Sequence, residues 1–205
     1  MAGALASIAG FILLTILTWG QTTKVIALGI FGLSLFFLYT MSALYHGIKL
    51  PEKKRIWFNK LDHVAIFLLI AGTYTPIVAI LFPPVWRTVI LVVIWTATAL
   101  GIIYKIFSKR IHGLINVSLY LIIGWAGAIP AIFLSQLRPV FSSDGFRLIL
   151  LGGLIYTVGF FIYFKKRPNP WPNVFGHHEI WHLFVLGGSL CHFLFMLFYI
   201  VPHQG

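Results

Sequence analysis

The chain has 205 residues, of which 60% are apolar and 9% are charged, and its mean hydropathy is +0.95. A soluble protein of this size needs far more polar surface, so the composition indicates an integral membrane protein. The net charge of +11 comes from basic residues dispersed over short loops. This pattern favours membrane topology and contact with lipid headgroups, and we expect no nucleic-acid binding.

Apolar runs of about 20 residues, long enough to cross roughly 30 Å of hydrocarbon as a helix, recur along the whole chain. The alternating pattern of barrel strands is absent, so each run should form a helix that satisfies its own backbone hydrogen bonds in lipid. The expected spans are residues 3–18, 25–45, 64–82, 86–104, 114–134, 146–164 and 179–201. The sequence therefore predicts an all-α, polytopic membrane protein, a seven-transmembrane helix bundle that forms one domain over residues 1–205.

The first apolar run and the single cysteine bear on signal-peptide cleavage and on disulfide formation. The first apolar run lacks a basic flank before it and a small-residue cleavage site after it, so we expect a true span and no signal peptide. The single cysteine, Cys191, excludes an intrachain disulfide.

The positions of Lys and Arg predict the orientation, because basic loops are retained in the cytoplasm. The loops after the second, fourth and sixth spans hold eleven of the fifteen basic residues: Lys49, Lys53, Lys54, Arg55, Lys60, Lys105, Lys109, Arg110, Lys165, Lys166 and Arg167. With these loops inside, the N-terminus is expected in the cytoplasm and the C-terminus outside.

Five polar side chains fall at the ends of these spans that the charge pattern places on the cytoplasmic side. They are Ser42, His46, Asp62, His178 and His182. The orientation was obtained without these residues, so their common membrane side is an independent observation. It favours one shared site.

Within this group, spacing indicates a metal centre. Residues four apart lie on one helical face, so His178 and His182 can chelate one ion, and Ser42 and His46 face the same way. Three imidazoles, with His46 as the third, suit Zn²⁺ and leave a fourth position for water. Asp62 either ligates the ion directly or holds the water and acts as a general base, and Ser42 is a weaker candidate for orienting water or a carbonyl.

Structural explanations exist for each residue alone. A histidine at a membrane boundary is often an interfacial residue, and an Asp at a helix start often caps it. His178-Glu179-x-x-His182 also matches the metalloprotease motif, in which the glutamate is the general base, although Glu179 equally suits a helix N-terminus. Together, the polar groups favour a functional site over separate structural roles, because ionisable residues inside membranes are costly.

Three further histidines are poorer candidates for ligands. His63 and His177 neighbour the candidates but point to other faces. His192 lies ten residues beyond His182, deeper in the membrane, and we expect it to hydrogen-bond to a neighbouring helix.

The motifs together resemble the hemolysin III family, the bacterial branch of the progestin and adipoQ receptor superfamily that includes the adiponectin receptors. They are Ser42-x-x-x-His46, Leu61-Asp62-His63 with 71–76 (AGTYTP), 176–182 (GHHEIWH) and Cys191-His192-Phe193. The resemblance implies seven helices with the N-terminus inside and an intramembrane zinc on His46, His178 and His182. Asp62 would reach the metal through water, with Ser42 beside it.

The leading hypothesis is a zinc-dependent hydrolase of membrane lipid amides or esters, since relatives in the superfamily look like hydrolases of lipids such as ceramide. The alternative is a membrane sensor or cytolytic protein in which zinc is a structural clamp between the second and seventh spans. Either protein would reside in the bacterial plasma (inner) membrane with membrane lipids as its partners. The sequence does not indicate an oligomeric state.

Overall fold

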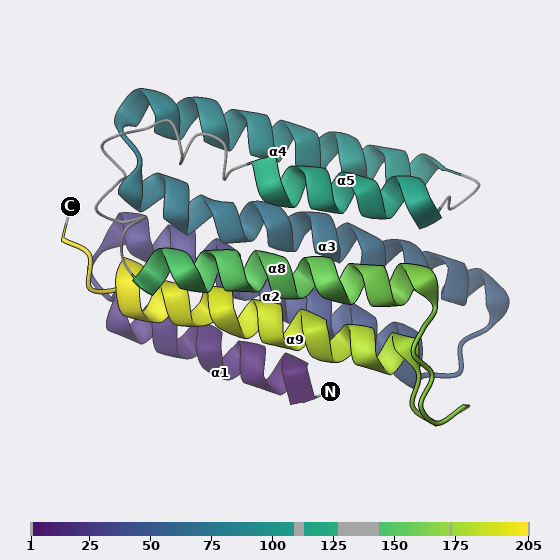
Figure 1. Cartoon of the computed structure of the whole chain (residues 1–205). Helices are drawn as coiled ribbons and strands as arrows, with labels where there is room; N and C mark the ends of the chain where they lie inside the picture. Colours follow the sequence, from purple (N-terminus) through teal and green to yellow (C-terminus); the bar gives the residue numbers. More distant parts are fainter. Residues whose placement is uncertain (1, 109–112, 127–143, 173, 205) are drawn as a thin grey trace. The chain divides into compact units, whose positions relative to one another are not determined.

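The computed structural model describes residues 2–108, 113–126, 144–172 and 174–204, and its regular structure there is helical apart from one bridge between Trp171 and Phe175 (Figure 1). The helices are α1 (Ala2–Leu17), α2 (Thr22–Gly47), α3 (Glu52–Leu81), α4 (Pro84–Phe107), α5 (Gly113–Ala126), α8 (Asp144–Lys165) and α9 (His177–Phe195), which continues as the π-helix η2 (Met196–Ile200). The all-α prediction is confirmed.

Five of these helices are long and apolar enough to cross a membrane: α2, α3, α4, α8 and the continuous segment His177–Ile200. The chain is therefore a multi-pass membrane protein. Helix α1 is apolar but shorter, with 16 residues. Of the span expected over residues 114–134, α5 covers the first part, and the rest lies outside the described residues.

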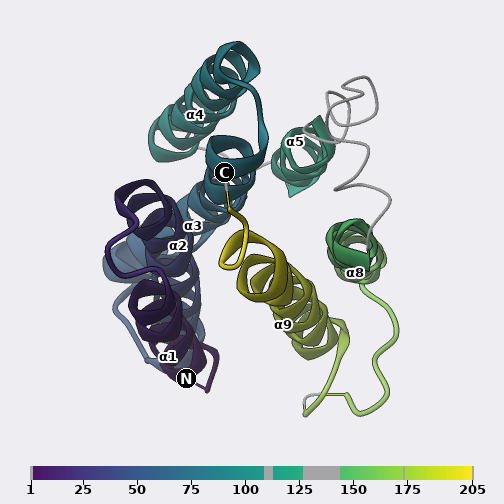
Figure 2. The same cartoon turned by 90° about the vertical axis from the view of Figure 1, so that its left-hand side faces the viewer.

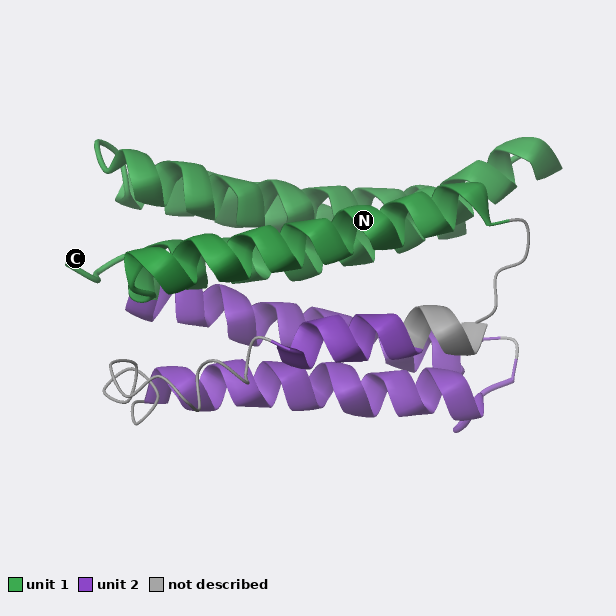
Figure 3. Ribbon diagram, turned by 90° about the horizontal axis from the view of Figure 1, so that it is seen from above, with its two compact units in different colours: residues 1–112, 200–205 green, residues 113–199 purple. Residues whose placement is uncertain are grey.

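The chain divides into two compact units, residues 1–112 with 200–205 and residues 113–199, which Figure 3 colours separately. The single domain expected from the sequence stays a prediction. In the first unit each helix packs on the next, so α3 lies between α2 and α4 (Figure 2).

Close helix approach in the first unit depends on small residues. A Cβ placed on Gly72 of α3 would lie 2.3 Å from the Ser34 hydroxyl of α2, and one on Gly101 of α4 would lie 2.5 Å from the Phe67 ring of α3. Lipid is as apolar as the side chains themselves, so helices in a membrane gain stability from tight packing of this kind.

The second unit contains α5, α8 and α9, and α8 packs along α9 (Figure 1). Gly145, Gly152 and Gly159 recur every seventh residue of α8, are all buried, and face Tyr199, His192 and Phe184 of the segment opposite. A hydrogen bond of 2.8 Å between the Tyr156 hydroxyl and Ser189 Oγ also joins these helices. The glycine stripe is thus the face of α8 that contacts α9 and η2.

Two helix boundaries correct the sequence analysis. The third span was expected to begin near Asp62, but α3 begins at Glu52, ten residues earlier. The fourth was expected to end at Tyr104, with Lys105 in a cytoplasmic loop, but α4 continues to Phe107 and Lys105 is buried in it. Hydropathy detects only the part of a helix that contacts hydrocarbon, so polar ends of the same helix are missed.

Candidate functional site

In the first unit, three of the candidate residues come from the α2–α3 pair. Ser42 and His46 occupy the last turns of α2, and Asp62 lies in the first half of α3. The Ser42 hydroxyl donates a hydrogen bond to the Asp62 carboxylate, and both residues are half-buried. The structure therefore brings Ser42 and Asp62 together.

The position of Asp62 also decides against one structural explanation. Because α3 begins at Glu52 and its N-cap is Pro51, Asp62 is ten residues inside the helix and cannot cap it. A carboxylate within a membrane helix is costly unless it is paired or hydrated. Its hydrogen bond to Ser42 supplies part of that compensation, and the remaining acceptor capacity of the two oxygens is available to another group.

His46 is exposed at the end of α2, and its ring meets the Tyr45 ring edge-on with centroids 4.5 Å apart. It lies one turn beyond Ser42 on the same helical face. A histidine in the last turn of a helix can adjust its ring direction more easily than one in the helix interior.

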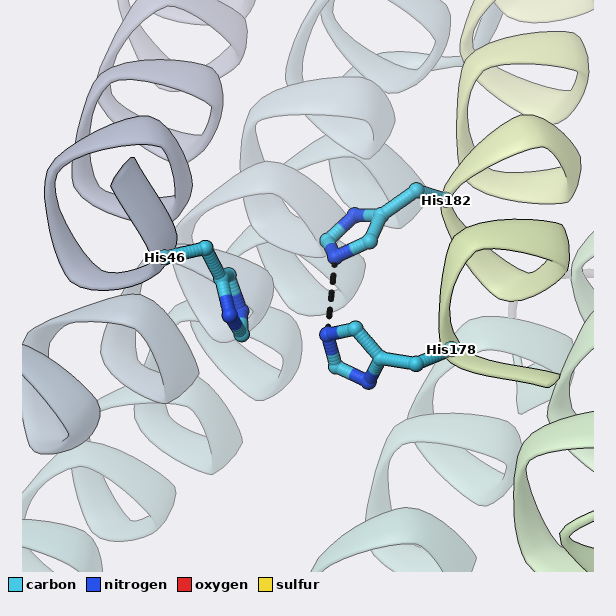
Figure 4. A group of neighbouring side chains, drawn as sticks. All are labelled: His46, His178 and His182. Atoms are coloured by element: carbon cyan, nitrogen blue, oxygen red, sulfur yellow. Dashed lines mark hydrogen bonds between the residues drawn. The ribbon is translucent and has the colours of Figure 1, made fainter. Parts of the chain in front are cut away.

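In the second unit, His178 and His182 form a close pair on the first two turns of α9. Their Nε2 atoms are 3.1 Å apart, and the dashed line in Figure 4 marks this contact. The rings meet edge-on with centroids 4.7 Å apart, and both side chains are half-buried. The i, i+4 spacing thus converges two imidazole nitrogens on one point, as the sequence predicted.

The aromatic side chain of Tyr163 on α8 packs beside this pair. Its ring centroid lies 5.8 Å from that of His178 and 5.7 Å from that of Trp181. These contacts hold the first turn of α9 against the last turn of α8. The direction of the His178 ring is therefore set partly by a neighbouring helix.

Glu179 forms a capping box at the start of α9. Its Oε2 atom accepts a hydrogen bond of 2.8 Å from the backbone N–H of Gly176, the N-cap residue, and the side chain is exposed. This is the structural role that the sequence analysis set beside the protease interpretation. The carboxylate is occupied at the helix end, where it also stabilises the positive end of the helix dipole.

The three histidines that the sequence made poorer candidates, His63, His177 and His192, have other surroundings. His63 Nδ1 lies 2.7 Å from the carbonyl of Asn59 on its own helix, and His177 contacts the side chain of Asn169 at 2.9 Å. His192 was expected to hydrogen-bond to a neighbouring helix, but its buried Nδ1 has no hydrogen-bond partner in the part of the chain that the structure describes. Its ring stacks on Tyr156 of α8, with centroids 5.8 Å apart.

Sequence reasoning missed Lys105, which is 1% exposed and interacts electrostatically with Asp62. It was counted as a loop residue because it follows the apolar run. A signal was present, since the buried residues of α4 form one stripe: Ile90, Ile94, Thr98, Gly101 and Lys105. Lys105 continues a helical face that begins in hydrocarbon.

Comparison with known proteins gives consistent matches over nearly the whole chain. A family described as "Haemolysin-III related" matches residues 1–193. Hemolysin-3 of Bacillus cereus is 39% identical, with 98% of this chain and 88% of that protein covered, and the hemolysin-3 homolog of Bacillus subtilis strain 168 is 38% identical, with 97% and 90% covered. The adiponectin receptor protein of Drosophila melanogaster is 26% identical, with 84% and 42% covered.

Proposed function

Because the chain belongs to the haemolysin III-related family of membrane proteins, we propose that it is a zinc-dependent hydrolase of membrane lipid amides or esters. The single observation that carries this proposal is the convergence of His178 Nε2 and His182 Nε2 at 3.1 Å. Two nitrogens that bind one tetrahedral zinc at 2.0–2.1 Å are roughly 3.3 Å apart, so the pair needs only a small adjustment to accept the ion.

His46 is the third ligand in this proposal. The sequence supplies His46, His178 and His182 as the proposed ligand set, each with one ring nitrogen. Three neutral imidazoles favour zinc over magnesium or calcium, which prefer oxygen ligands. Such a set supports catalysis because it leaves one coordination position open.

When bound, zinc would act as a Lewis acid that polarises a scissile carbonyl and makes a water molecule more acidic. The chain itself supplies the proton acceptor. Asp62, held by the Ser42 hydroxyl, accepts the proton of the attacking water and later returns it to the leaving amine or alcohol. Ser42 fixes the direction of the carboxylate, and its own role is positioning.

The proposal also includes the membrane setting. We place the N-terminus in the cytoplasm, the C-terminus outside and the protein in the bacterial plasma membrane, on the basis of the Lys and Arg distribution. The ends of α2 and α9 that bear histidines then lie towards the cytoplasm. Membrane lipids are both the solvent and the source of substrate, which would enter laterally from the bilayer.

A second candidate is a membrane sensor or cytolytic protein in which the metal is a structural clamp. The observation that favours it is the origin of the ligands on α2 and α9, two helices far apart along the chain. Ligation energy would then stabilise the fold without any reactive water. Direct ligation by Asp62 in a closed tetrahedral site distinguishes this role from catalysis.

The test is metal content by mass spectrometry on detergent-purified protein, with hydrolysis of a fluorescent ceramide assayed on the same samples. We expect wild type to retain zinc and to hydrolyse the lipid. The His46→Ala, His178→Ala and His182→Ala variants should lose both properties, while the matched control His177→Ala should retain both. Asp62→Ala should keep the metal and lose turnover.

Two other results would change the conclusion. Zinc retained by wild type without hydrolysis of any lipid amide or ester favours the structural clamp. No zinc in wild type after the metal is added back refutes both candidates.

A further inference from the structure

Lys105 is a buried cation that the residues discussed so far leave without a role. It lies on α4, two residues before the helix ends, and its side chain is 1% exposed. Its Nζ atom is buried and has no hydrogen-bond partner among the residues that the structure describes. A charged amine in this state is costly, and intramembrane charges of this kind generally pair with an opposite charge.

The packing of α4 on α3 shows which residue faces Lys105. Three contacts define an antiparallel register: Trp95 Nε1 donates to Thr75 Oγ1 at 3.2 Å, Gly101 touches the Phe67 ring, and the carbonyl of Ile106 accepts a hydrogen bond from Lys60 Nζ. Lys105 falls between the last two of these contacts. The corresponding level of α3 is the turn that bears Asp62.

Asp62 and Lys105 interact electrostatically across this contact. Asp62 is half-buried and receives a hydrogen bond from Ser42 on its other side. A carboxylate has two oxygens and about four acceptor positions, so a cation can pair with Asp62 without displacing Ser42. The carboxylate is thus flanked by α2 and α4.

The other lysine near this level is already engaged. Lys60 donates to the carbonyl of Ile106 at the C-terminal end of α4, and its Nζ lies 5.5 Å from the centroid of the Trp57 ring. Lys60 and Asp62 are two residues apart on one helix, a spacing that does not bring side chains together. Among the residues that the structure describes, Lys105 is therefore the cation placed to act on Asp62.

Lys24 is a buried lysine of the same unit whose ammonium group is hydrogen-bonded. It is 8% exposed, and its Nζ donates hydrogen bonds to the carbonyls of Val201 and His203. Lys105 is buried more deeply, and its Nζ has no such bonds to the described residues. This difference indicates that the charge of Lys105 is the counter-charge of another ionised group.

We infer that Lys105 is a positioning residue: its ammonium group is the counter-charge that holds Asp62 in place, opposite the hydrogen bond from Ser42. The inference deepens the proposed function, on which its catalytic consequence rests. The pairing itself belongs to α3 and α4 and does not require a bound metal. Asp62 is then held between a neutral donor and a cation, and this fixes the orientation of its carboxylate.

The pairing is tested by a double-mutant cycle on full-length, detergent-purified protein treated with a chelator. The thermal midpoint Tm is measured for wild type, Asp62→Asn, Lys105→Met and the double variant. If the charges interact, the double variant unfolds about 2–10 °C above the temperature that the two single shifts predict together. Additive shifts overturn the inference. If Lys105→Met alone does not fold, Lys105→Gln replaces it in the same cycle.

The catalytic consequence is tested on the zinc-loaded protein. Lys105→Met should lower kcat about 10–100-fold, the usual effect of removing a group that orients a catalytic residue, with KM little changed. Lys105→Arg, which keeps the charge, should restore most of kcat, and the matched control Lys24→Met should have wild-type kcat. An unchanged kcat in Lys105→Met contradicts the inference.

The two tests separate the two proposals. If wild type hydrolyses no lipid, the proposed function fails, while coupling between Asp62 and Lys105 still confirms the pair. If wild type is active and the cycle is additive, the inference fails and the proposed function stands.

Discussion

Replacement of Glu179 separates a helix cap from a catalytic base. Glu179 Oε2 accepts the Gly176 N–H at 2.8 Å from an exposed position at the start of α9. Glu179→Ala removes this charge-assisted bond together with a favourable interaction with the helix dipole, a loss of about 1–2 kcal/mol. For a chain of this length that is a decrease in Tm of roughly 2–8 °C.

Glu179→Gln provides the control, because an amide oxygen can still accept the hydrogen bond. Only the charge is lost, so we expect a cost of about 0.3–1 kcal/mol. Both variants should retain zinc and a wild-type kcat at a temperature well below Tm, since Asp62 is the proposed base. Thermal unfolding and lipid hydrolysis on the same preparations provide the assay. A fall in kcat of a hundredfold or more in Glu179→Gln, with Tm nearly unchanged, would refute this reasoning and favour the metalloprotease interpretation.

Three further predictions concern packing and polar contacts. Gly159→Ala should lower Tm, because its new Cβ would lie 2.5 Å from the Cβ of Phe184 and overpacking costs about 1–3 kcal/mol. Gly124→Ala should leave Tm unchanged or raise it, because a Cβ added there meets no side chain within 4 Å among the described residues. Tyr156→Phe should destabilise the protein by about 1 kcal/mol in the same melting assay, through loss of the hydrogen bond to Ser189. Ser42→Ala should retain zinc by mass spectrometry but lower kcat about tenfold, because its hydroxyl no longer holds Asp62, and Ser42→Thr should recover activity.

The sequence was sufficient for the helical class and for the spacing of the histidine pair on α9. Both follow from local periodicity: apolar length predicts a spanning helix, and i, i+4 spacing places two side chains on one face. The structure confirms both, with five helices long enough to span and His178 facing His182. The structure also brings Ser42 to Asp62, two residues that the sequence assigned to one site.

The role of Lys105 and the depth of Asp62 were beyond the sequence analysis. Both depend on how far a helix continues past its apolar run, which is decided by packing on a neighbour. Helix α4 packs closely on α3 at Gly101 and continues beyond it to Phe107. Lys105 lies in this last part of the helix and is buried there. A hydropathy window reports contact with lipid and contains no information on such contacts between helices.

The order in which the helices pack has a consequence for biogenesis. Within the described residues, the main helix contacts join α1 to α2, α2 to α3, α3 to α4 and α8 to α9, which are successive along those parts of the chain. Such local contacts form quickly and need no distant partner, so the hairpin that carries Ser42 and Asp62 can assemble during membrane insertion. His178 and His182 emerge only with the final helix. For the proposed zinc site, metal loading would therefore be a maturation step that follows synthesis, and a cell short of zinc would accumulate an inserted, helical apoprotein.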